Sequence, residues 1–262
     1  MLRLVERIGQ KTTQGIEELG YVTSLLVESL YWLAWGKHRR QPVRIPSVFE
    51  ETMRIGVQAI PIVSVLSFSV GVMLAIQGIE TLKTFGAESK VVLGIALAVT
   101  REFSPLIVGI LVAGRSGSAI TARIGTMLES QEIDALRVIG INPVRYLSAP
   151  TLLAMLVALP SLAILGDFMG MLGGGVYTSL ELGISLDAYA QRSMEVLSVD
   201  DIRQGLIKSV IFGVLIALVG VSNGFQVRGG AEGVGRATTR SVVMAISCIV
   251  LADMIFTYFL NR

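Results

Sequence analysis

The stretch Gly114–Pro150 reads GRSGSAITARIGTMLESQEIDALRVIGINPVRYLSAP and lies between two strongly apolar spans. Within it, Thr126 and Glu129 have the T-x-x-E spacing of a capping box, and Gly140 can take the left-handed conformation that ends many helices. Pro143 prevents the helix from continuing. The pattern predicts a cytoplasmic loop helix of about three turns, from which another protein could transmit force to the spans. An interfacial helix with no partner is the alternative.

The predicted loop helix has two different faces. Apolar residues fall on one side of it, at Ile133, Leu136 and Ile139 or Gly140. This side can rest on membrane-embedded protein while the other side presents charge outward. The outward charged residues, which would dock a partner, are Glu132, Asp134 and Arg137.

The rest of the chain is strongly apolar. Hydrophobic residues make up 52% of the 262, and charged residues only 16%, which is typical of polytopic helical membrane proteins. We therefore predict an all-α membrane protein, in which each span has about 20 apolar residues and crosses a hydrocarbon core of about 30 Å. About five spans are expected, at 56–78, 91–114, 147–173, 206–225 and 241–260.

The N-terminal segment is expected to lie on the membrane and not to cross it. Gly20 to Trp35 is apolar but short, with Glu28 inside it and Tyr31 and Trp32 near its end. Aromatic residues and an internal charge favour an interfacial helix over a sixth span. We accordingly divide the chain into an amphipathic segment, 1–50, and a membrane domain, 51–262.

The distribution of positive charge predicts the orientation. With the N-terminus inside, most arginines and lysines fall on the cytoplasmic side. The N-terminus and the loop helix should then be cytoplasmic, and the C-terminus should lie outside. The outer side would keep only Lys83, Lys90, Arg192, Arg203 and Arg262.

Several ionisable residues lie inside the predicted spans, namely Arg101, Glu102, Asp167, Lys208 and Asp253. Each is costly when it faces lipid, so each should face protein, a partner charge or a wet cavity. One interpretation is a polar pocket that opens outward and suits an amphiphile. The other is a set of buried ion pairs, Arg101 or Lys208 with Asp253 or Glu102, that fix the register of the helices. Both stay open.

The sequence argues against catalytic and metal chemistry in this chain. Cys248 is the single cysteine and His38 the single histidine, so neither a disulfide framework nor a zinc or haem cluster is expected. No G-x-x-x-x-G-K-[ST] motif occurs, so any dependence on ATP must come from a separate subunit. No internal repeat relates the halves, and a homodimer would restore a two-fold axis and a shared central cavity.

Four stretches of the sequence carry a resemblance to a known family, and they are Thr100–Met127, Glu132–Pro150, Leu206–Val214 and Gly233–Val243. They resemble the MlaE-type permeases of ABC lipid transporters, which work with Mce-domain proteins. The resemblance extends from about Val48 to the end of the chain. It departs from the family at Arg123, where an acidic residue is usual, and at Thr151, where arginine is common.

The resemblance implies a homodimeric permease of the bacterial inner membrane that moves phospholipid between the inner and outer membranes. Two cytoplasmic P-loop ATPase subunits would bind ATP and Mg²⁺, and an Mce-protein hexamer would sit on the periplasmic side. No cofactor in this chain and no nucleic acid is expected. By the same resemblance, Glu132 to Gly140 is the coupling helix. The lipid site is placed at Leu74, Leu82, Phe85 and Glu102.

Two other functions remain as alternatives. The chain could be a proton-coupled secondary lipid transporter that uses Glu102 and Asp253 as proton sites. It could also be a membrane scaffold for Mce proteins that transports nothing.

Overall fold

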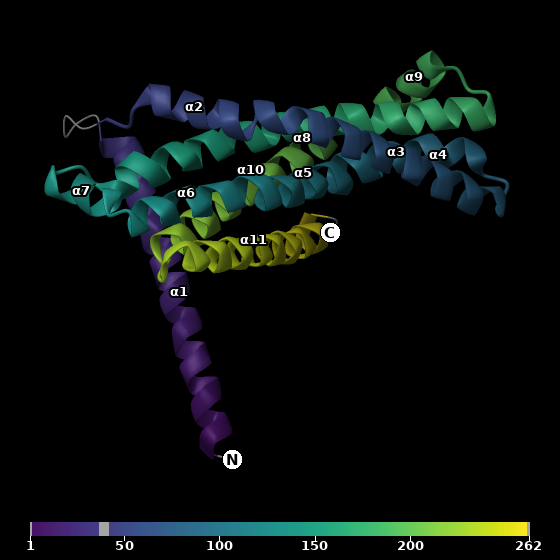
Figure 1. Ribbon diagram of the computed structural model, residues 1–262. Coiled ribbons are helices and arrows are strands. Elements are labelled where there is room, and N and C mark those ends of the chain that lie inside the picture. Colours follow the sequence, from purple (N-terminus) through teal and green to yellow (C-terminus); the bar gives the residue numbers. More distant parts are fainter. Residues whose placement is uncertain (1, 37–41, 261–262) are drawn as a thin grey trace.

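The computed structural model describes residues 2–36 and 42–260, and all regular structure within them is helical. His38 and Arg262 lie outside the described residues. Most of the long helices run alongside one another (Figure 1). One end of the bundle carries α7 and the start of α2, and the other carries α9 and the connection between α3 and α4. The protein is an all-α polytopic membrane protein, as predicted.

Five helical stretches among the described residues are long and apolar enough to cross a membrane. Four of them contain a predicted span whole, and the last contains all of its span but residue 260. All five are longer than predicted, because helical hydrogen bonding continues into polar residues that hydropathy does not detect. The stretches are Ile45–Lys83, Val91–Glu129, Val144–Leu182, Val199–Phe225 and Gly230–Phe259.

The first span consists of α2 (Ile45–Ile55), the short η1 (Val57–Ala59) and α3 (Ile60–Lys83). After η2 (Glu88–Lys90), the second span alternates α-helical and π-helical segments. These segments are α4 (Val91–Ala98), η3 (Val99–Phe103), α5 (Ser104–Val112), η4 (Ala113–Gly117) and α6 (Ser118–Glu129).

The third span begins with another π-helical segment, η5 (Val144–Ser148), and continues as α8 (Ala149–Leu182). Proline accounts for two of these π-helical segments, because its ring crowds the carbonyl four residues earlier and it has no N–H to donate. Pro105 acts in this way on η3, and Pro150 on η5. After α8 the chain continues with α9 (Leu186–Val196), α10 (Val199–Phe225) and α11 (Gly230–Leu260).

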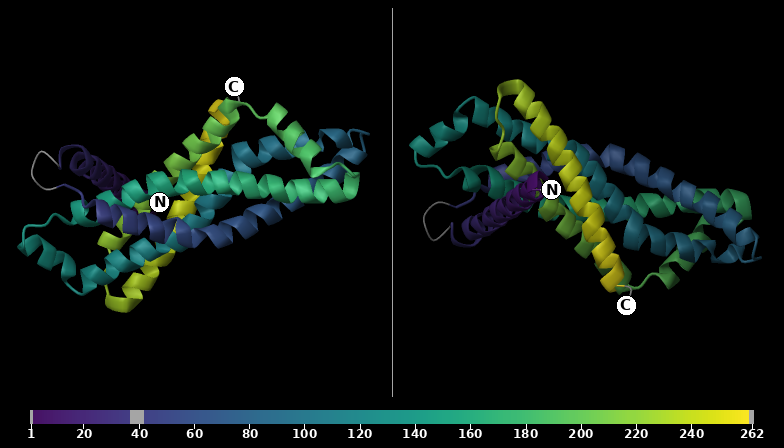
Figure 2. Two further views of the ribbon diagram at one scale, coloured as in Figure 1. Left: turned by 90° about the horizontal axis from the view of Figure 1, so that it is seen from above. Right: turned by 90° about the horizontal axis from the view of Figure 1, so that it is seen from below.

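The main core lies where α3, α5, α6, α8, α10 and α11 meet. Buried aliphatic and aromatic side chains such as Met155, Phe212 and Ile216 fill it. The helix α11 crosses the others obliquely and exposes much of its length (Figure 2). A smaller cluster around Ala75, Ile79 and Tyr189 joins α3, α4 and α9 at the far end.

The helix α1 (Leu2–Trp35) crosses the bundle at a steep angle, and its N-terminal part projects away from it (Figure 1). Its C-terminal half docks on η5. There the Glu28 carboxylate accepts a hydrogen bond from Asn142 at 2.8 Å, and the hydroxyls of Ser29 and Ser148 are 2.8 Å apart. The helix begins earlier than the apolar segment after Gly20 indicated, and it is not among the five membrane-crossing stretches.

The loop helix is α7 (Glu132–Val138), and its start differs from the prediction. Thr126 and Glu129 lie in the last turn of α6, so they do not form a capping box for α7. The chain turns instead at Gln131, which has a φ of 61°. The helix is therefore about two turns long and not three.

The end of α7 agrees with the prediction. Gly140 has a φ of 78°, a conformation that glycine adopts without steric cost. Its N–H donates to the carbonyl of Arg137 at 3.0 Å, and the Ile141 N–H donates to the carbonyl of Leu136 at 2.8 Å. This pair of bonds is the Schellman motif, which satisfies carbonyl groups at the end of a helix.

The contact between α3 and α8 generates a first prediction. A Cβ atom at Gly71 would overlap the backbone of Gly170, and one at Gly173 would overlap the backbone of Phe68. Because backbone cannot move aside as a flexible side chain can, Gly71→Ala and Gly173→Ala should each lower the free energy of unfolding by about 3 kcal/mol or more. Thermal unfolding in mild detergent measures this effect. Gly235→Ala is the control, since no atom lies within 4 Å of its Cβ position, and equal midpoints for all three variants would contradict the packing argument.

Candidate functional site

A buried ion cluster joins three helical segments within the membrane-spanning bundle. The Lys208 ammonium on α10 has no solvent exposure and lies 2.6 Å from a Glu102 carboxylate oxygen. On the other side, it lies 3.0 Å from an oxygen of Asp253 on α11. It also donates to the Thr257 hydroxyl at 2.9 Å, and this hydroxyl donates to Glu102 at 3.0 and 3.1 Å. One cation thus holds two carboxylates from different spans.

This geometry matches the ion-pair interpretation of the intramembrane charges. A buried ammonium is costly unless carboxylates and hydrogen bonds surround it, and Lys208 has both. Removing Lys208 would leave two neighbouring carboxylates without a counter-charge, so the cluster fixes how η3, α10 and α11 lie against each other. Thr257 was not singled out from the sequence, because a threonine in an apolar span gives no signal of its own.

Arg101 does not belong to this cluster, which corrects the predicted network. Its guanidinium instead contacts Asp201 at the start of α10, with Nε at 2.6 Å and Nη2 at 2.5 Å from the same oxygen. Neighbouring residues on a helix point about 100° apart. Arg101 and Glu102 must therefore face different partners.

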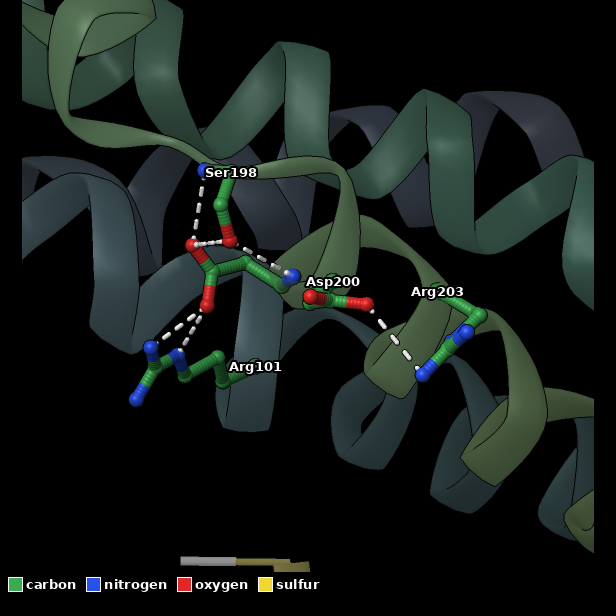
Figure 3. A network of polar contacts seen from close by, with 5 residues as sticks. Arg101, Ser198, Asp200 and Arg203 are labelled. Carbon is green, nitrogen blue, oxygen red and sulfur yellow. Dashed lines mark hydrogen bonds and ion pairs between the residues drawn. The ribbon is translucent and has the colours of Figure 1, made fainter.

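The Asp201 carboxylate is held from a second side by the chain in front of α10. The backbone N–H and the hydroxyl of Ser198 each lie 2.8 Å from its other oxygen, and the Ser198 hydroxyl accepts from the Asp201 N–H at 3.3 Å. Figure 3 shows Arg101 and Ser198 converging, while Asp200 pairs with Arg203 at the surface. The sequence analysis did not single out the contact between Ser198 and Asp201, although the S-x-x-D spacing of a capping box could have predicted it.

A largely apolar groove of about 310 Å³ lies between α3 and α4 at the α9 end of the bundle. Leu74 and Leu82 line it, and both were expected at the lipid site. The other two expected residues lie elsewhere: Phe85 is exposed beyond the end of α3, and Glu102 belongs to the Lys208 cluster. The sequence did not single out the remaining lining residues, which are Gln77, Gly78, Thr81, Val91, Gly94 and Ile95.

Next to this groove, two contacts fix the end of the bundle. Lys83 at the end of α3 donates to Glu181 on α8 at 2.9 Å. Tyr189 on α9 is buried against α8 and α4, where burial raises the pKa of its phenol to about 12. The phenol stays protonated at physiological pH, so Tyr189 brings no charge into the contact between α9 and the bundle.

The charged side of α7 is free of the bundle, while Ile133 is fully buried and anchors the helix. Glu132 accepts a hydrogen bond from Ser130 at 2.8 Å, and Asp134 pairs with Arg137 at 3.0 Å. Ile139 was expected on the buried side but is exposed, because α7 ends at Val138 and the chain turns at the next glycine. Val138 is exposed too, so the helix presents charged side chains and an apolar tip together.

These features belong to a known architecture, because residues 48–259 match the family described as Permease MlaE. The chain belongs to the MlaE permease family. The match includes four of the five membrane-crossing stretches whole and the first stretch from residue 48 onward, and it leaves out α1.

Bacterial relatives of this MlaE-family permease are matched over nearly their whole length. It is 32% identical over 258 residues to the Intermembrane phospholipid transport system permease protein MlaE of Haemophilus influenzae, which covers 98% of this chain and 97% of that protein. It is 30% identical over 258 residues to a Probable ABC transporter permease protein of Rickettsia prowazekii, with the same two coverages. It is also 35% identical over 213 residues to the chloroplastic protein TRIGALACTOSYLDIACYLGLYCEROL 1 of Arabidopsis thaliana, covering 81% of this chain and 61% of that protein.

The ion cluster of this MlaE-family permease can be tested by a double-mutant cycle. Lys208→Met leaves Glu102 and Asp253 as neighbouring, partly buried carboxylates without a counter-charge and should lower the free energy of unfolding by about 3–5 kcal/mol. Asp253→Leu should also destabilise the protein. The double variant should cost less than the sum of the two, because the residues are in contact.

Thermal or denaturant unfolding in detergent provides the measurement. Arg203→Gln is the matched control, since its exposed pair with Asp200 should contribute about 1 kcal/mol or less. Strict additivity of the Lys208 and Asp253 substitutions would show that these two side chains do not interact.

Proposed function

We propose that this chain is the membrane subunit of an ABC transporter that moves phospholipid between the inner and outer membranes of a bacterium. The observation that carries the proposal is the loop helix α7, which lies at the end of the bundle opposite the groove. Buried Ile133 anchors this helix, and its exposed side presents charged side chains and an apolar tip. A transporter needs such a pair of sites, one that receives force and one that holds cargo. Membership of the MlaE family supports the same function.

The coupling step would act through α7. A cytoplasmic ATPase with its own P-loop binds ATP and Mg²⁺ and docks on Glu132, Asp134 and Arg137. Movement of α7 passes directly to both neighbouring spans, because α6 precedes it and η5 follows it. In this proposal the permease carries no catalytic residue and no cofactor of its own.

The cargo site would be the groove between α3 and α4. Acyl chains would contact Leu74 and Leu82, with Gln77 and Thr81 as polar neighbours. Phe85, exposed beyond the end of α3, would contact lipid outside the groove. Glu102 has a different part in this arrangement: it positions the helices through Lys208 and does not line the groove.

The assembly would place the α7 end in the cytoplasm and the groove toward the periplasm. The excess of arginine at the α7 end supports this orientation. A second copy of the chain would supply the two-fold axis, and an Mce-domain hexamer would receive or deliver lipid on the periplasmic side of the inner membrane. A proton-coupled mechanism has less support, because both proposed proton sites, Glu102 and Asp253, are paired with Lys208.

Charge reversal on α7 tests the coupling. Glu132→Lys should abolish lipid transfer by the reconstituted transporter while the chain remains inserted, because it reverses the charge presented to the ATPase without touching the buried anchor. Lipid transfer and ATP hydrolysis are measured together in proteoliposomes. Asp200→Lys, which reverses an exposed charge at the start of α10, should transfer lipid normally. Wild-type transfer and lipid-stimulated hydrolysis by the Glu132 variant would refute docking at α7.

Site-specific photo-crosslinking tests the groove. A photoreactive residue placed at Leu74 or Leu82 should capture phospholipid in cells more often than one at Val157 or Val250. The latter two are exposed on α8 and α11 and do not line the groove. Lipid extracted from the crosslinked chain is quantified by mass spectrometry. Equal capture at all four positions would mean that only bulk bilayer lipid is sampled, and the groove would not be a cargo site.

A further inference from the structure

A second cavity, of about 240 Å³, lies at the α7 end of the bundle between α2 and the segment formed by η4 and α6. Its charged lining consists of Arg54, Arg115, Arg123 and Glu51, which gives a net charge of +2. It shares no residue with the groove between α3 and α4 or with the Lys208 cluster. Neither transport of lipid through the groove nor coupling through α7 uses these arginines.

Arg115 is the least compensated of the three cations. It donates to the Gln58 side-chain oxygen at 2.8 Å and contacts the Arg54 carbonyl at 3.5 Å, and both acceptors are uncharged. Within the described part of the chain, no carboxylate lies within ion-pair distance of its guanidinium. Arg54 contacts Glu50 only at 3.9 Å and at the surface. Among the described residues, the guanidinium of Arg115 therefore has no protein anion within ion-pair distance, and that of Arg54 has only a distant one at the surface.

Deeper in the cavity, two buried polar groups lack a hydrogen-bond partner. Arg123 is paired with Glu51 through Nη1, but its buried Nε donates to no acceptor. The buried Ser116 hydroxyl has no partner either. Buried donors without acceptors cost about 1–3 kcal/mol each, so an acceptor-rich ligand would offset a penalty that the protein already carries.

We infer that this cavity, the arginine cleft, binds a phosphate-type oxyanion. Arginine presents planar pairs of N–H donors that match phosphate oxygens, and Arg115 offers such donors at the mouth of the cleft. The Ser116 hydroxyl and Arg123 Nε lie beneath the surface of the cavity, and rotation of their side chains would turn these unpartnered donors toward a bound oxyanion. Glu51 reduces the attraction and orients Arg123.

The height of the cleft in the membrane indicates how an oxyanion reaches it. Val91 begins the second span, and Arg115 follows 24 residues later, about 36 Å away at about 1.5 Å per residue. This length exceeds a hydrocarbon core of about 30 Å, so Arg115 lies at the level of lipid headgroups in the leaflet at the α7 end. The phosphate can come from such a headgroup or from free phosphate in solution.

Both sources can be tested with the purified full-length chain. Native mass spectrometry measures retention of dioleoylphosphatidylglycerol, and thermal unfolding measures stabilisation by inorganic phosphate. Arg115→Gln should weaken the binding of phosphatidylglycerol or of inorganic phosphate, whichever occupies the cleft, about tenfold, because it removes a charge-assisted contact. Glu51→Gln should strengthen it several-fold, because it removes the competing carboxylate and keeps a hydrogen-bond acceptor for Arg123. Arg236→Gln, an exposed arginine at the same end, is the control and should change neither measurement.

Each outcome decides the inference. Loss of phosphatidylglycerol in Arg115→Gln with a gain in Glu51→Gln identifies a lipid headgroup, and the same pattern with inorganic phosphate alone identifies a free anion. A gain cannot arise from misfolding, so the Glu51 variant keeps the test valid if the Arg115 variant is unstable. If neither ligand responds to either substitution, the cleft is not an oxyanion site. If both ligands bind normally but Arg115→Gln no longer copurifies with its ATPase, the cleft docks a protein and the inference is wrong.

Discussion

The arrangement of the spans depends on one fully buried ammonium, that of Lys208. Inside a membrane-spanning bundle such a cation is tolerated only beside negative charge, and Glu102 and Asp253 provide it from η3 and α11. Apolar packing between helices in lipid has little directional preference, because lipid tails are as apolar as leucine. The ion cluster supplies that direction and sets the rotation of three segments at once.

The π-helical segment η3 makes this cluster possible. It carries Arg101 and Glu102 next to each other, and their side chains point in different directions. Arg101 pairs with Asp201 at the start of α10, and Glu102 pairs with Lys208 further along the same helix. The second span is thus attached to α10 at two heights. Such double attachment suits a part of a transporter that must move as a unit, since a load on α6 would be carried through α5 and η3 to α10.

The two ends of the molecule differ in chemistry as a consequence of this scaffold. At one end, α7 presents charge and an apolar tip, α1 docks on η5 through hydrogen bonds, and arginines gather between α2 and α6. At the other end, α3 and α4 form a largely apolar groove and uncharged Tyr189 fastens α9. The ends are joined by α3 and α8, whose backbones approach closely at Gly71 and Gly173.

The sequence by itself determined the five spans, the end of α7 at Gly140 and the resemblance to MlaE permeases, because hydropathy, glycine conformation and local motifs are properties of short stretches. Tertiary structure alone decided the partners of the charges. Arg101 and Asp201 form an ion pair although they are 100 residues apart in the sequence, and the hydrogen bond from Thr257 to Glu102 joins residues 155 positions apart. Which residues meet depends on the rotation of each helix, and prolines and π-helical segments change that rotation in ways that a regular helical period does not predict. The rotation of the helices also pairs Arg123 with Glu51, and it leaves the Ser116 hydroxyl and the Nε of Arg123 buried without hydrogen-bond partners.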